Sequence, residues 1–363
     1  MTVTIVAGAR PNFMKIAPII HAIQKKQNEG KNINFRLVHT GQHYDKNLSD
    51  QFFEELNIPQ PHVNFEVKSG TQAEQTASIM IAFEKDLEQN PTNLVLVVGD
   101  VTSTMACAIV AKKASVDVAH VEAGIRSGDL KMPEEINRMV TDSITDWFFT
   151  TSTHANNHLK KSGISDDRIF YVGNTMIDTL LKNLNNLKQP HMWDDLNLKP
   201  KQYFVLTLHR PSNVDETIQL KQLISLICDL NNGLPIIFPV HPRTKKMLDN
   251  ANISHSNLHL IEPLGYLEFN FLVKNAFAVL TDSGGITEEA TIMNVPCITF
   301  RDNTERPETC EIGTNELVGS NTEKIKNAFR TLFAGKWKQG QTPDLWDGKT
   351  SERIVNILLE LYD

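Results

Sequence analysis

The sequence predicts an α/β protein built from two doubly wound parallel sheets. Short apolar runs recur along the chain, and each is followed by polar residues and then by a stretch with helical spacing. This series occurs twice, on either side of the polar segment 183–201. Such runs are typical of buried parallel strands joined by crossover helices, and 363 residues are enough for two domains of this kind.

The first series predicts an N-terminal domain over residues 1–173. Its expected strands are 2–7, 34–39, 63–67, 94–98, 116–121, 148–150 and 169–174, and its expected helices are 12–26, 46–56, 71–88 and 133–147. Pro11 fits the first turn of the first helix, because that turn does not need the N–H group that proline lacks. Asn90-Pro91 is expected to end the third helix, since a proline cannot continue it.

The second series predicts a C-terminal domain over residues 174–349. Its first helix is expected at 175–184, and its strands at 203–208, 236–240, 258–261, 278–281 and 297–300, with helices between them. An amphipathic helix at 350–363 is expected to pack back on the N-terminal domain. We expect both domains to be Rossmann-like and to face each other across a cleft, with ligands at the carboxyl ends of the strands.

The composition argues against several classes of protein. A formal net charge of −7 gives no general affinity for nucleic acid. The four cysteines have no paired spacing, and neither CxxC nor HExxH occurs, so reduced thiols and no metal are expected. No apolar stretch approaches the ~20 residues that a membrane helix needs. The sequence therefore predicts a cytoplasmic enzyme without a membrane partner.

Two acidic residues directly follow predicted strands of the first domain. Asp100 comes after strand 94–98, and Glu122 comes after strand 116–121. Glu134 begins the helix after Pro133, and it can reach the same edge of the sheet. Converging carboxylates raise one another's pKa and can pass protons in both directions. Asp100 alone could merely cap a helix, but the three residues together predict a chemical centre.

Basic residues flank the start of the first predicted helix. Arg10 and Lys15 lie near its N-terminal end, where backbone N–H groups and the helix dipole favour an anion. An alternative is that Arg10 and Lys15 are only solvated charges on the helix surface. The order of strand, Gly8 and helix favours an anion site over that alternative.

Polar residues also follow the strands of the second domain. His209-Arg210 follows one strand, His241 follows another, and Ser283-Gly284-Gly285 opens a helix. Small residues at a helix start let backbone N–H groups approach a phosphate, and Glu289 one turn later could accept two ribose hydroxyl groups. A Ser-Gly-Gly turn alone is a weak signal, and a lone histidine is usually structural. Two histidines that end strands at one edge favour a binding site.

A diphosphate bound at this helix would meet further cations. His209, Arg210 and Arg306 together would supply the basic pocket that an acidic protein otherwise lacks. Glu288, by contrast, is expected to lie on a solvated face of the helix.

The motifs as a set resemble those of a known enzyme family. They are Gly8-Ala9-Arg10-Pro11 with Lys15, Thr40-Gly41-Gln42-His43, Gly99-Asp100, His120-Val121-Glu122-Ala123-Gly124-Ile125-Arg126, Pro133-Glu134-Glu135-Ile136-Asn137-Arg138, His209-Arg210, His241-Pro242 and Asp282-Ser283-Gly284-Gly285-Ile286-Thr287-Glu288-Glu289-Ala290. In this order, across nearly the full length, the chain resembles the non-hydrolysing UDP-N-acetylglucosamine 2-epimerases, which have a two-domain fold of the glycosyltransferase-B (GT-B) type.

The resemblance implies a reaction and roles for residues. The family interconverts UDP-GlcNAc and UDP-ManNAc without metal or cofactor, by eliminating UDP to a 2-acetamidoglucal and adding it back. It implies acid/base roles for Asp100, Glu122 and Glu134, with His209 near the diphosphate. It implies substrate or UDP binding by Arg10, Lys15, Arg138, Arg210, His241, Ser283, Gly284, Gly285, Glu289 and Arg306. Relatives are commonly homodimers.

The chain departs from the family pattern at several positions. His209-Arg210-Pro211-Ser212-Asn213 stands where many members read His-Arg-Arg-Glu-Asn, and His241-Pro242-Arg243-Thr244 stands where His-Pro-Asn-Pro is usual. Some members bind a second UDP-GlcNAc as an activator near the residues matching Gln42 and His43 and a downstream Arg, where this chain has Lys68. The resemblance therefore leaves an activator site open.

Several other functions fit part of the pattern. Arg243 could face an acidic sugar substituent, which keeps epimerases of modified UDP-acetamidosugars such as UDP-2,3-diacetamido-2,3-dideoxyglucuronic acid as alternatives. A hydrolysing 2-epimerase, a GT-B glycosyltransferase and a non-catalytic sugar-nucleotide sensor are also open. Three clustered carboxylates exceed what a transferase or a sensor needs. A dehydrogenase is disfavoured, because Gly8-Ala9-Arg10 is not a GxGxxG turn.

Overall fold

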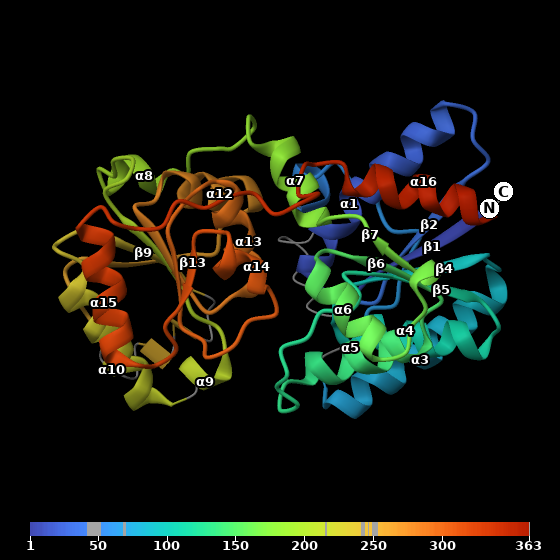
Figure 1. The fold of residues 1–363 in the computed structure, drawn as a ribbon, viewed down its shortest axis with the longest axis horizontal. Coiled ribbons are helices and arrows are strands. Elements are labelled where there is room, and N and C mark those ends of the chain that lie inside the picture. The colour runs from blue at the N-terminus through green and yellow to red at the C-terminus, as the bar shows by residue number, and fades with distance from the viewer. Residues whose placement is uncertain are drawn as a thin grey trace. The chain divides into compact units, whose positions relative to one another are not determined.

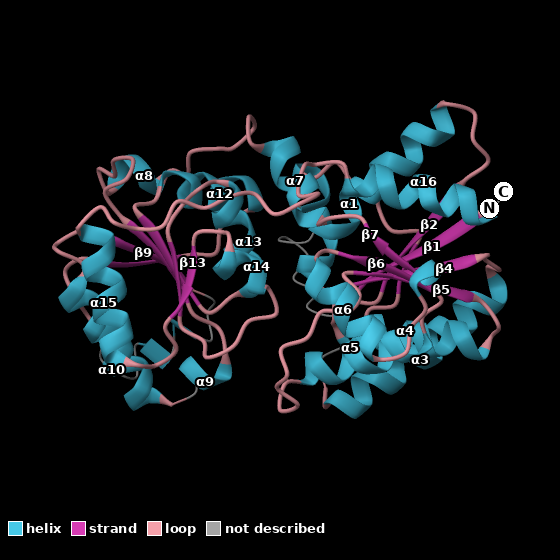
Figure 2. Cartoon of the chain, viewed as in Figure 1, coloured by secondary structure: helices cyan, strands magenta, loops and turns pink. Residues whose placement is uncertain are grey.

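The computed structural model describes residues 1–41, 52–67, 70–214, 216–240, 244–245, 247–248 and 253–362. Within this part the chain forms two parallel sheets, each with helices on both faces (Figures 1 and 2). The contacts divide it into a first unit, Met1–Lys182 with Asp344–Asp363, and a second unit, Asn183–Pro343. The prediction of two doubly wound parallel α/β domains is confirmed. Domain boundaries at Gly173 and at residue 349 stay a prediction.

The sheet of the first unit has seven parallel strands in the order β3-β2-β1-β4-β5-β6-β7. They are β1 (Thr2–Ala7), β2 (Asn34–His39), β3 (Val63–Asn64), β4 (Leu94–Val98), β5 (Asp117–Val121), β6 (Trp147–Thr150) and β7 (Ile169–Tyr171). The chain first builds outward from β1 through β2 and then returns to add β4 on the other side. The strand order thus reverses between β1 and β4, which is where open parallel sheets bind ligands.

In the described residues, the α-helices of the first unit are α1 (Arg10–Asn28), α3 (Gln72–Gln89), α4 (Thr102–Lys113), α5 (Pro133–Ile144), α6 (Thr153–Lys161), α7 (Thr175–Asn183) and α16 (Thr350–Tyr362). Apolar residues of α3 and α4, such as Phe83 and Val110, pack against Val95 and Val97 of β4. Helix α1 contacts β1, β2, β4 and α16. Burial of both faces explains why the strands read as continuous apolar runs.

The C-terminal helix α16 belongs to the first unit and lies beside α1 (Figure 1). Asp178 of α7 accepts the backbone N–H groups of Thr350 and Ser351 at 3.1 and 2.7 Å, and so caps the start of α16. The indole N–H of Trp346 donates to the carbonyl of Thr151 at 3.1 Å. A carboxylate at a helix N-terminus satisfies N–H groups that have no partner within the helix, so this end of the chain is held firmly.

The sheet of the second unit has six parallel strands in the order β10-β9-β8-β11-β12-β13. They are β8 (Phe204–Thr207), β9 (Ile236–Pro239), β10 (Leu258–Ile261), β11 (Ala278–Thr281), β12 (Cys297–Thr299) and β13 (Asn315–Leu317). The reversal of strand order recurs here, between β8 and β11. In each unit the reversal of strand order marks the carboxyl edge at which a ligand is expected.

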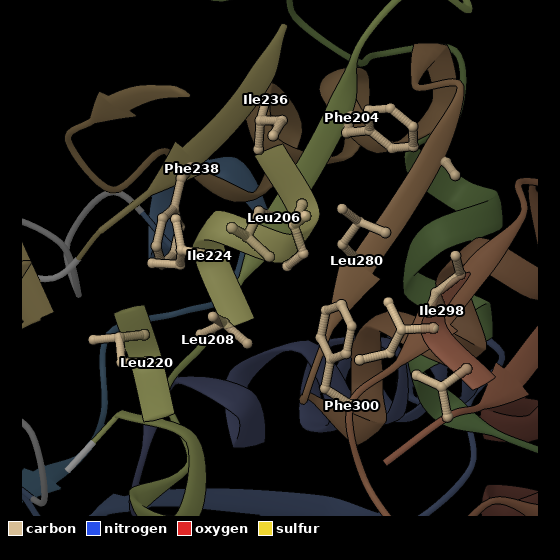
Figure 3. Packing of buried hydrophobic residues seen from close by; sticks show 14 of the residues in the cluster. Phe204, Leu206, Leu208, Leu220, Ile224, Ile236, Phe238, Leu280, Ile298 and Phe300 are labelled. Atoms are coloured by element: carbon tan, nitrogen blue, oxygen red, sulfur yellow. The ribbon is translucent and has the colours of Figure 1, made fainter. Parts of the chain in front are cut away.

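Alternating side chains of these strands build two cores. Phe204 and Leu206 point to the face covered by α10 (Thr217–Leu230) and α15 (Thr322–Phe333), as Figure 3 shows for the strand residues and α10. Tyr203 and Val205 point to the other face, against α12 (Tyr266–Asn275) and α13 (Gly284–Ile292). The period of two along a strand makes this division. The shorter helices α8 (Met192–Asp195), α9 (Pro211–Val214) and α14 (Pro307–Glu311) complete the unit.

The structure corrects some predicted elements. The helix expected through Trp147 ends at Ile144, and Trp147 instead begins β6, paired with Ala119 of β5. Only Val63–Asn64 of the expected strand 63–67 is a strand, and residues 46–51 of the helix expected at 46–56 lie outside the described part. Helices α6 and α15 and strand β13 were not predicted individually. β13 is a polar edge strand, which carries little apolar signal.

Candidate functional site

Asn12 joins the two turns at the switch point of the first unit. Its side-chain oxygen accepts the N–H groups of Gly8 and Ala9, both at 2.9 Å, and its amide nitrogen donates to the carbonyl of Val98 at 3.2 Å. The turn after β1 is thereby tied to the end of β4. The sequence interpretation missed Asn12, which is the third residue of α1 and bonds back to the backbone N–H of the N-cap Ala9, as in a capping box.

Lys15 and Glu122 form a buried ion pair at this edge. Lys15 Nζ lies 2.8 Å from Glu122 Oε2, and the two side chains are 12% and 3% exposed. Glu122 has φ +71°, a left-handed conformation that costs a residue with a Cβ roughly 1–2 kcal/mol. Gly99, with φ +66°, leaves room for the pair, because a Cβ there would lie 2.8 Å from Lys15 Nζ. Strain of this kind is characteristic of functional sites.

Asp100 is held by helix α5. Arg138 bonds its carboxylate through Nε, at 3.1 Å, and through Nη2, and the same guanidinium donates Nη1 to Glu135 at 2.7 Å. Asn137 also donates to the backbone carbonyl of Asp100 at 2.8 Å. Arg138 is almost fully buried, and one planar guanidinium bridging two carboxylates is a geometry that lysine cannot reproduce.

Glu134 is half-buried in the first turn of α5. It lies four residues before Arg138, and positions four apart share one face of a helix. Glu134 is therefore on the side of α5 that grips Asp100. Arg10 is the first residue of α1, at the start of the turn that Asn12 organises. The structure thus brings Lys15 to Glu122 and Arg138 to Asp100, while the convergence of all three acids on one substrate atom stays a prediction.

Asp282 organises the switch point of the second unit. It is fully buried and accepts the backbone N–H groups of His209 and Arg210 at 3.1 and 3.0 Å, and the side-chain amide of Asn213 at 3.0 Å. Its carboxylate also lies 2.8 Å from Nδ1 of His209, whose side chain is 59% exposed. Burial alone would raise the pKa of Asp282, but the hydrogen bond and charge of His209, with the other donors, hold it below the usual value. The buried carboxylate of Asp282 thus fixes the orientation of the exposed His209 ring.

The start of α13 has the small residues expected of an anion site. Ser283 is the N-cap, and Gly284 and Gly285 are the first two residues of the helix. A Cβ on Gly284 would lie 3.6 Å from Glu305 Oε2 and 3.9 Å from Arg301 Nη1, which form an ion pair at 2.6 Å. Arg301 and Glu305 were not singled out from the sequence, because nothing in their local pattern separates them from an ordinary loop.

The arginines of this region are paired with buried glutamates. Arg210 Nη2 lies 3.4 Å from Glu305 Oε1, and Arg306 forms an ion pair with Glu288. Glu288 is 1% exposed, so the expectation that it lies on a solvated helix face is wrong. A carboxylate this deep needs a cation or several donors, and Arg306 supplies the cation. Binding of a diphosphate by Arg210 and Arg306 stays a prediction.

Glu289 is buried beside two polar residues of α12. Asn270 donates to its Oε1 at 3.3 Å, and the phenol of Tyr266 also hydrogen-bonds it. Burial raises the pKa of Glu289 to about 7, and the hydrogen bonds from Tyr266 and Asn270 offset only part of that effect. These two partners could not be read from the sequence, because they lie on a different helix.

Replacing Glu289 with Gln is expected to change how stability depends on pH. A carboxyl group whose pKa rises from an ordinary 4.5 to about 7 on folding binds its proton more tightly in the folded state, so the wild-type protein loses stability as pH rises through this range. Without ligand, the free energy of unfolding of Glu289→Gln should gain about 2 kcal/mol relative to wild type between about pH 5 and about pH 8.

Urea unfolding at several pH values measures this difference. Glu323→Gln is the control, because Glu323 is 69% exposed on α15 and its replacement should give a curve parallel to wild type. If Glu289→Gln also ran parallel to wild type, burial would not hold this carboxyl group protonated.

Some predicted site residues fall outside the described part of the chain. His241, Arg243, Gln42, His43 and Lys68 belong to this group, so their predictions stay predictions. In the part that the structure does describe, no cluster of three or more His, Cys, Asp or Glu residues could hold a metal ion. Within the same residues, no helix has the length and apolar character to cross a membrane.

Comparison with known proteins places the chain among characterised relatives. The sequence profile of the family described as UDP-N-acetylglucosamine 2-epimerase matches residues 25–359. A UDP-N-acetylglucosamine 2-epimerase of Methanocaldococcus jannaschii is 45% identical over an alignment of 370 residues, which covers 99% of each chain. The chain belongs to the UDP-N-acetylglucosamine 2-epimerase family. The resemblance inferred from the motifs is therefore confirmed, and members of this family are isomerases.

A solved structure and one further relative of this epimerase family bear on fold and substrate. The crystal structure of the M. jannaschii UDP-GlcNAc 2-epimerase in complex with UDP-GlcNAc and UDP superposes with a TM-score of 0.90 and covers 100% of both chains. A UDP-2,3-diacetamido-2,3-dideoxy-D-glucuronate 2-epimerase of Pseudomonas aeruginosa is 36% identical, covering 99% of this chain and 100% of that protein. The epimerase family thus includes members that act on a modified sugar.

Proposed function

We propose that this protein is a UDP-N-acetylglucosamine 2-epimerase that interconverts UDP-GlcNAc and UDP-ManNAc. The observation that carries the proposal is the paired arrangement of Glu122 with Lys15 and of Asp100 with Arg138 at the switch point of the first unit. A binding protein has no need for two strained or buried acids, each held by its own cation. Family membership supplies the substrate class.

The reaction begins with removal of the proton on C2 of the sugar. That proton is weakly acidic, so its loss accompanies departure of UDP: the C2–H and C1–O bonds break, and a C1=C2 double bond forms. One carboxylate among Asp100, Glu122 and Glu134 accepts the proton. Reversal, with a proton delivered to the opposite face of C2 and UDP oxygen returned to C1, inverts the configuration. Lys15 and Arg138 hold their carboxylates in fixed positions for this exchange.

The second unit holds the nucleotide in this proposal. Backbone N–H groups at the start of α13, beside Ser283, Gly284 and Gly285, bind the diphosphate. Glu289 accepts the hydroxyl groups of the ribose, with Asn270 donating to one of its oxygens. The exposed ring of His209, oriented by Asp282, lies at the same sheet edge and stabilises the charge that develops as UDP departs.

Incubation with UDP-GlcNAc in deuterated water tests the reaction. Epimerisation places deuterium at C2, forms UDP-ManNAc and leaves most UDP attached to sugar. Stoichiometric free UDP with free sugar would mean a hydrolysing enzyme instead. Absence of exchange with UDP-GlcNAc, together with exchange on UDP-2,3-diacetamido-2,3-dideoxyglucuronic acid, would mean that the substrate is the modified sugar. The relative in P. aeruginosa makes this the second candidate.

We propose a cytoplasmic homodimer that needs no cofactor, on the grounds of the family resemblance. A second UDP-GlcNAc bound near Gln42 and His43 would act as an activator. Sedimentation measures the oligomeric state, and the dependence of rate on UDP-GlcNAc concentration tests activation: a sigmoidal curve supports a second site, whereas a hyperbolic curve contradicts it.

A further inference from the structure

A buried histidine and aspartate lie directly beneath the two turns that carry Asp100 and Glu122. His120 of β5 is 0% exposed, and Asp142 of α5 is 4% exposed. His120 Nδ1 lies 2.7 Å from Asp142 Oδ1, and His120 Nε2 lies 2.8 Å from the backbone oxygen of Gly99. Neither residue is among those that the family resemblance made acid/base or binding residues, so the proposed mechanism does not yet use this pair.

Both partners of the His120 ring are hydrogen-bond acceptors. A carbonyl oxygen carries no proton. Burial alone would raise the pKa of Asp142, but its partners lower it, and Arg126, a permanent cation 2.7 Å from Oδ2, keeps this carboxylate ionised whatever the state of His120. A neutral imidazole has one N–H and one lone pair. With a single N–H, the other ring nitrogen would point its lone pair at the lone pair of an acceptor oxygen. The two short contacts are satisfied together only when each ring nitrogen carries a proton.

These contacts tie the two acidic turns to one helix. Gly99 is the residue before Asp100, and Val121 is the residue before Glu122. The N–H of Gly99 donates to the carbonyl of Val121 at 3.0 Å. Asp142 lies four residues after Arg138 on α5, hence on the same face. Helix α5 therefore holds the Gly99–Asp100 turn at three points: Arg138 at the Asp100 carboxylate, Asn137 at the Asp100 carbonyl, and Asp142 through His120 at the Gly99 carbonyl.

The far side of Asp142 is also occupied. Its Oδ2 accepts the N–H of Gly124 at 3.1 Å and lies 2.7 Å from Nη1 of Arg126. Gly124 follows Glu122 by two residues. Asp142 therefore contacts the backbone of the Glu122 turn directly, at Gly124, and the backbone of the Asp100 turn through His120, at Gly99. A buried carboxylate with this many donors has little freedom to move.

We propose that His120, with a proton on each ring nitrogen and anchored by Asp142, is a positioning residue that sets the Asp100 turn against the Glu122 turn for proton transfer at C2. The inference rests on the proposed function. His120 does not touch the substrate. It acts through the Gly99 carbonyl, where a displacement of about 1 Å in the reacting groups can cost on the order of 100-fold in rate.

Two replacements separate positioning from mere packing. The amide nitrogen of Gln occupies a place like His Nε2 and can keep the bond to Gly99, whereas that of Asn resembles His Nδ1 and can keep only the bond to Asp142. We expect kcat to fall about 100-fold in His120→Asn but only about 10-fold in His120→Gln, with KM and the Kd for UDP changed less than about 3-fold in both. A residue needed only for stability would lower activity in step with folding, not in this order.

His158→Gln is the matched control. His158 lies in the same unit, and its Nδ1 is 2.9 Å from the carbonyl of Gly124 rather than from the Gly99 carbonyl that His120 contacts. Its replacement is expected to leave kcat within about 3-fold of wild type. All variants are compared by deuterium incorporation at C2, with circular dichroism and thermal unfolding as measures of folding.

Nitrogen NMR of histidine-labelled wild-type protein provides a readout that needs no substrate. The His120 signals, identified by their loss in His120→Gln, are expected to show two protonated ring nitrogens near neutral pH. An unprotonated ring nitrogen, equal kcat in wild type and both His120 variants, or a loss confined to KM would each overturn the proposal. If wild type fails to exchange C2, the proposed function fails, while the NMR result still decides the state of His120.

Discussion

Glu122→Gln is expected to lower turnover of UDP-GlcNAc by about 1,000-fold while the affinity for UDP stays within a few-fold of wild type. The amide is nearly the same size as the carboxylate and can occupy the same buried site. It cannot accept a proton from C2 or return one. UDP affinity survives because the proposed nucleotide contacts belong to the other unit, around α13 and Glu289.

Rates of C2 exchange and calorimetric titration with UDP measure the two effects separately. Asp100→Asn and Glu134→Gln should likewise lower turnover while the affinity for UDP is retained. Glu74→Gln is a control, since Glu74 sits exposed in the first turn of α3, where it caps the helix through Thr71. Near-normal turnover in all three acid variants would refute the roles assigned to them. A parallel loss of UDP affinity in Glu122→Gln would show that the pair with Lys15 supports binding rather than chemistry.

Arg138→Lys is expected to lower turnover by about 100-fold and the free energy of unfolding by about 3 kcal/mol. One guanidinium reaches both Asp100 and Glu135, and Glu135 is 2% exposed. An ammonium group can bond only one of the two acids in that geometry. If the ammonium group bonds Asp100, Glu135 is left buried without its cation, and if it bonds Glu135, Asp100 is no longer held at a fixed place.

Arg36→Lys is the matched control for this prediction. Arg36 of β2 also bonds an acid of the first unit through two nitrogens, one of them 2.7 Å from Asp86, but it lies in the body of the sheet. Its replacement should cost stability with turnover within about 3-fold of wild type. Urea unfolding and initial rates distinguish the cases. Equal turnover in Arg36→Lys and Arg138→Lys would mean that the hold on Asp100 has no catalytic consequence.

The positions of the candidate site followed from the sequence because parallel strands share a polarity. Once 94–98 and 116–121 are recognised as strands, Asp100 and Glu122 must emerge at one edge, and the same logic places His209 with Ser283. The structure shows the ion pairs that hold these residues. No sequence pattern could indicate that Lys15, more than a hundred residues from Glu122, would reach it past the bare Cα of Gly99.

Partners brought by a different helix were beyond the reach of local patterns. Asn270 of α12 donates to Glu289. Arg306, at the start of α14, forms an ion pair with the buried Glu288, which was therefore wrongly expected to be solvated. The helical periodicity of the sequence also continued to Trp147, past the observed end of α5 at Ile144. The apolar spacing continues there, but Thr145 turns its hydroxyl back to the carbonyl of Thr141, and the chain enters the sheet. Tertiary pairing decided both cases.

The return of the chain to its first unit has a consequence during synthesis. The ribosome releases the last residues only after all of 183–343 has emerged, yet Ile354 and Leu358 of α16 are fully buried in the unit that was begun first. A nascent chain must therefore keep that unit's docking face uncovered until translation ends. The unit that starts first is the one that matures last, and a stop codon before Trp346 would leave a chain whose second unit is whole while its first unit lacks α16.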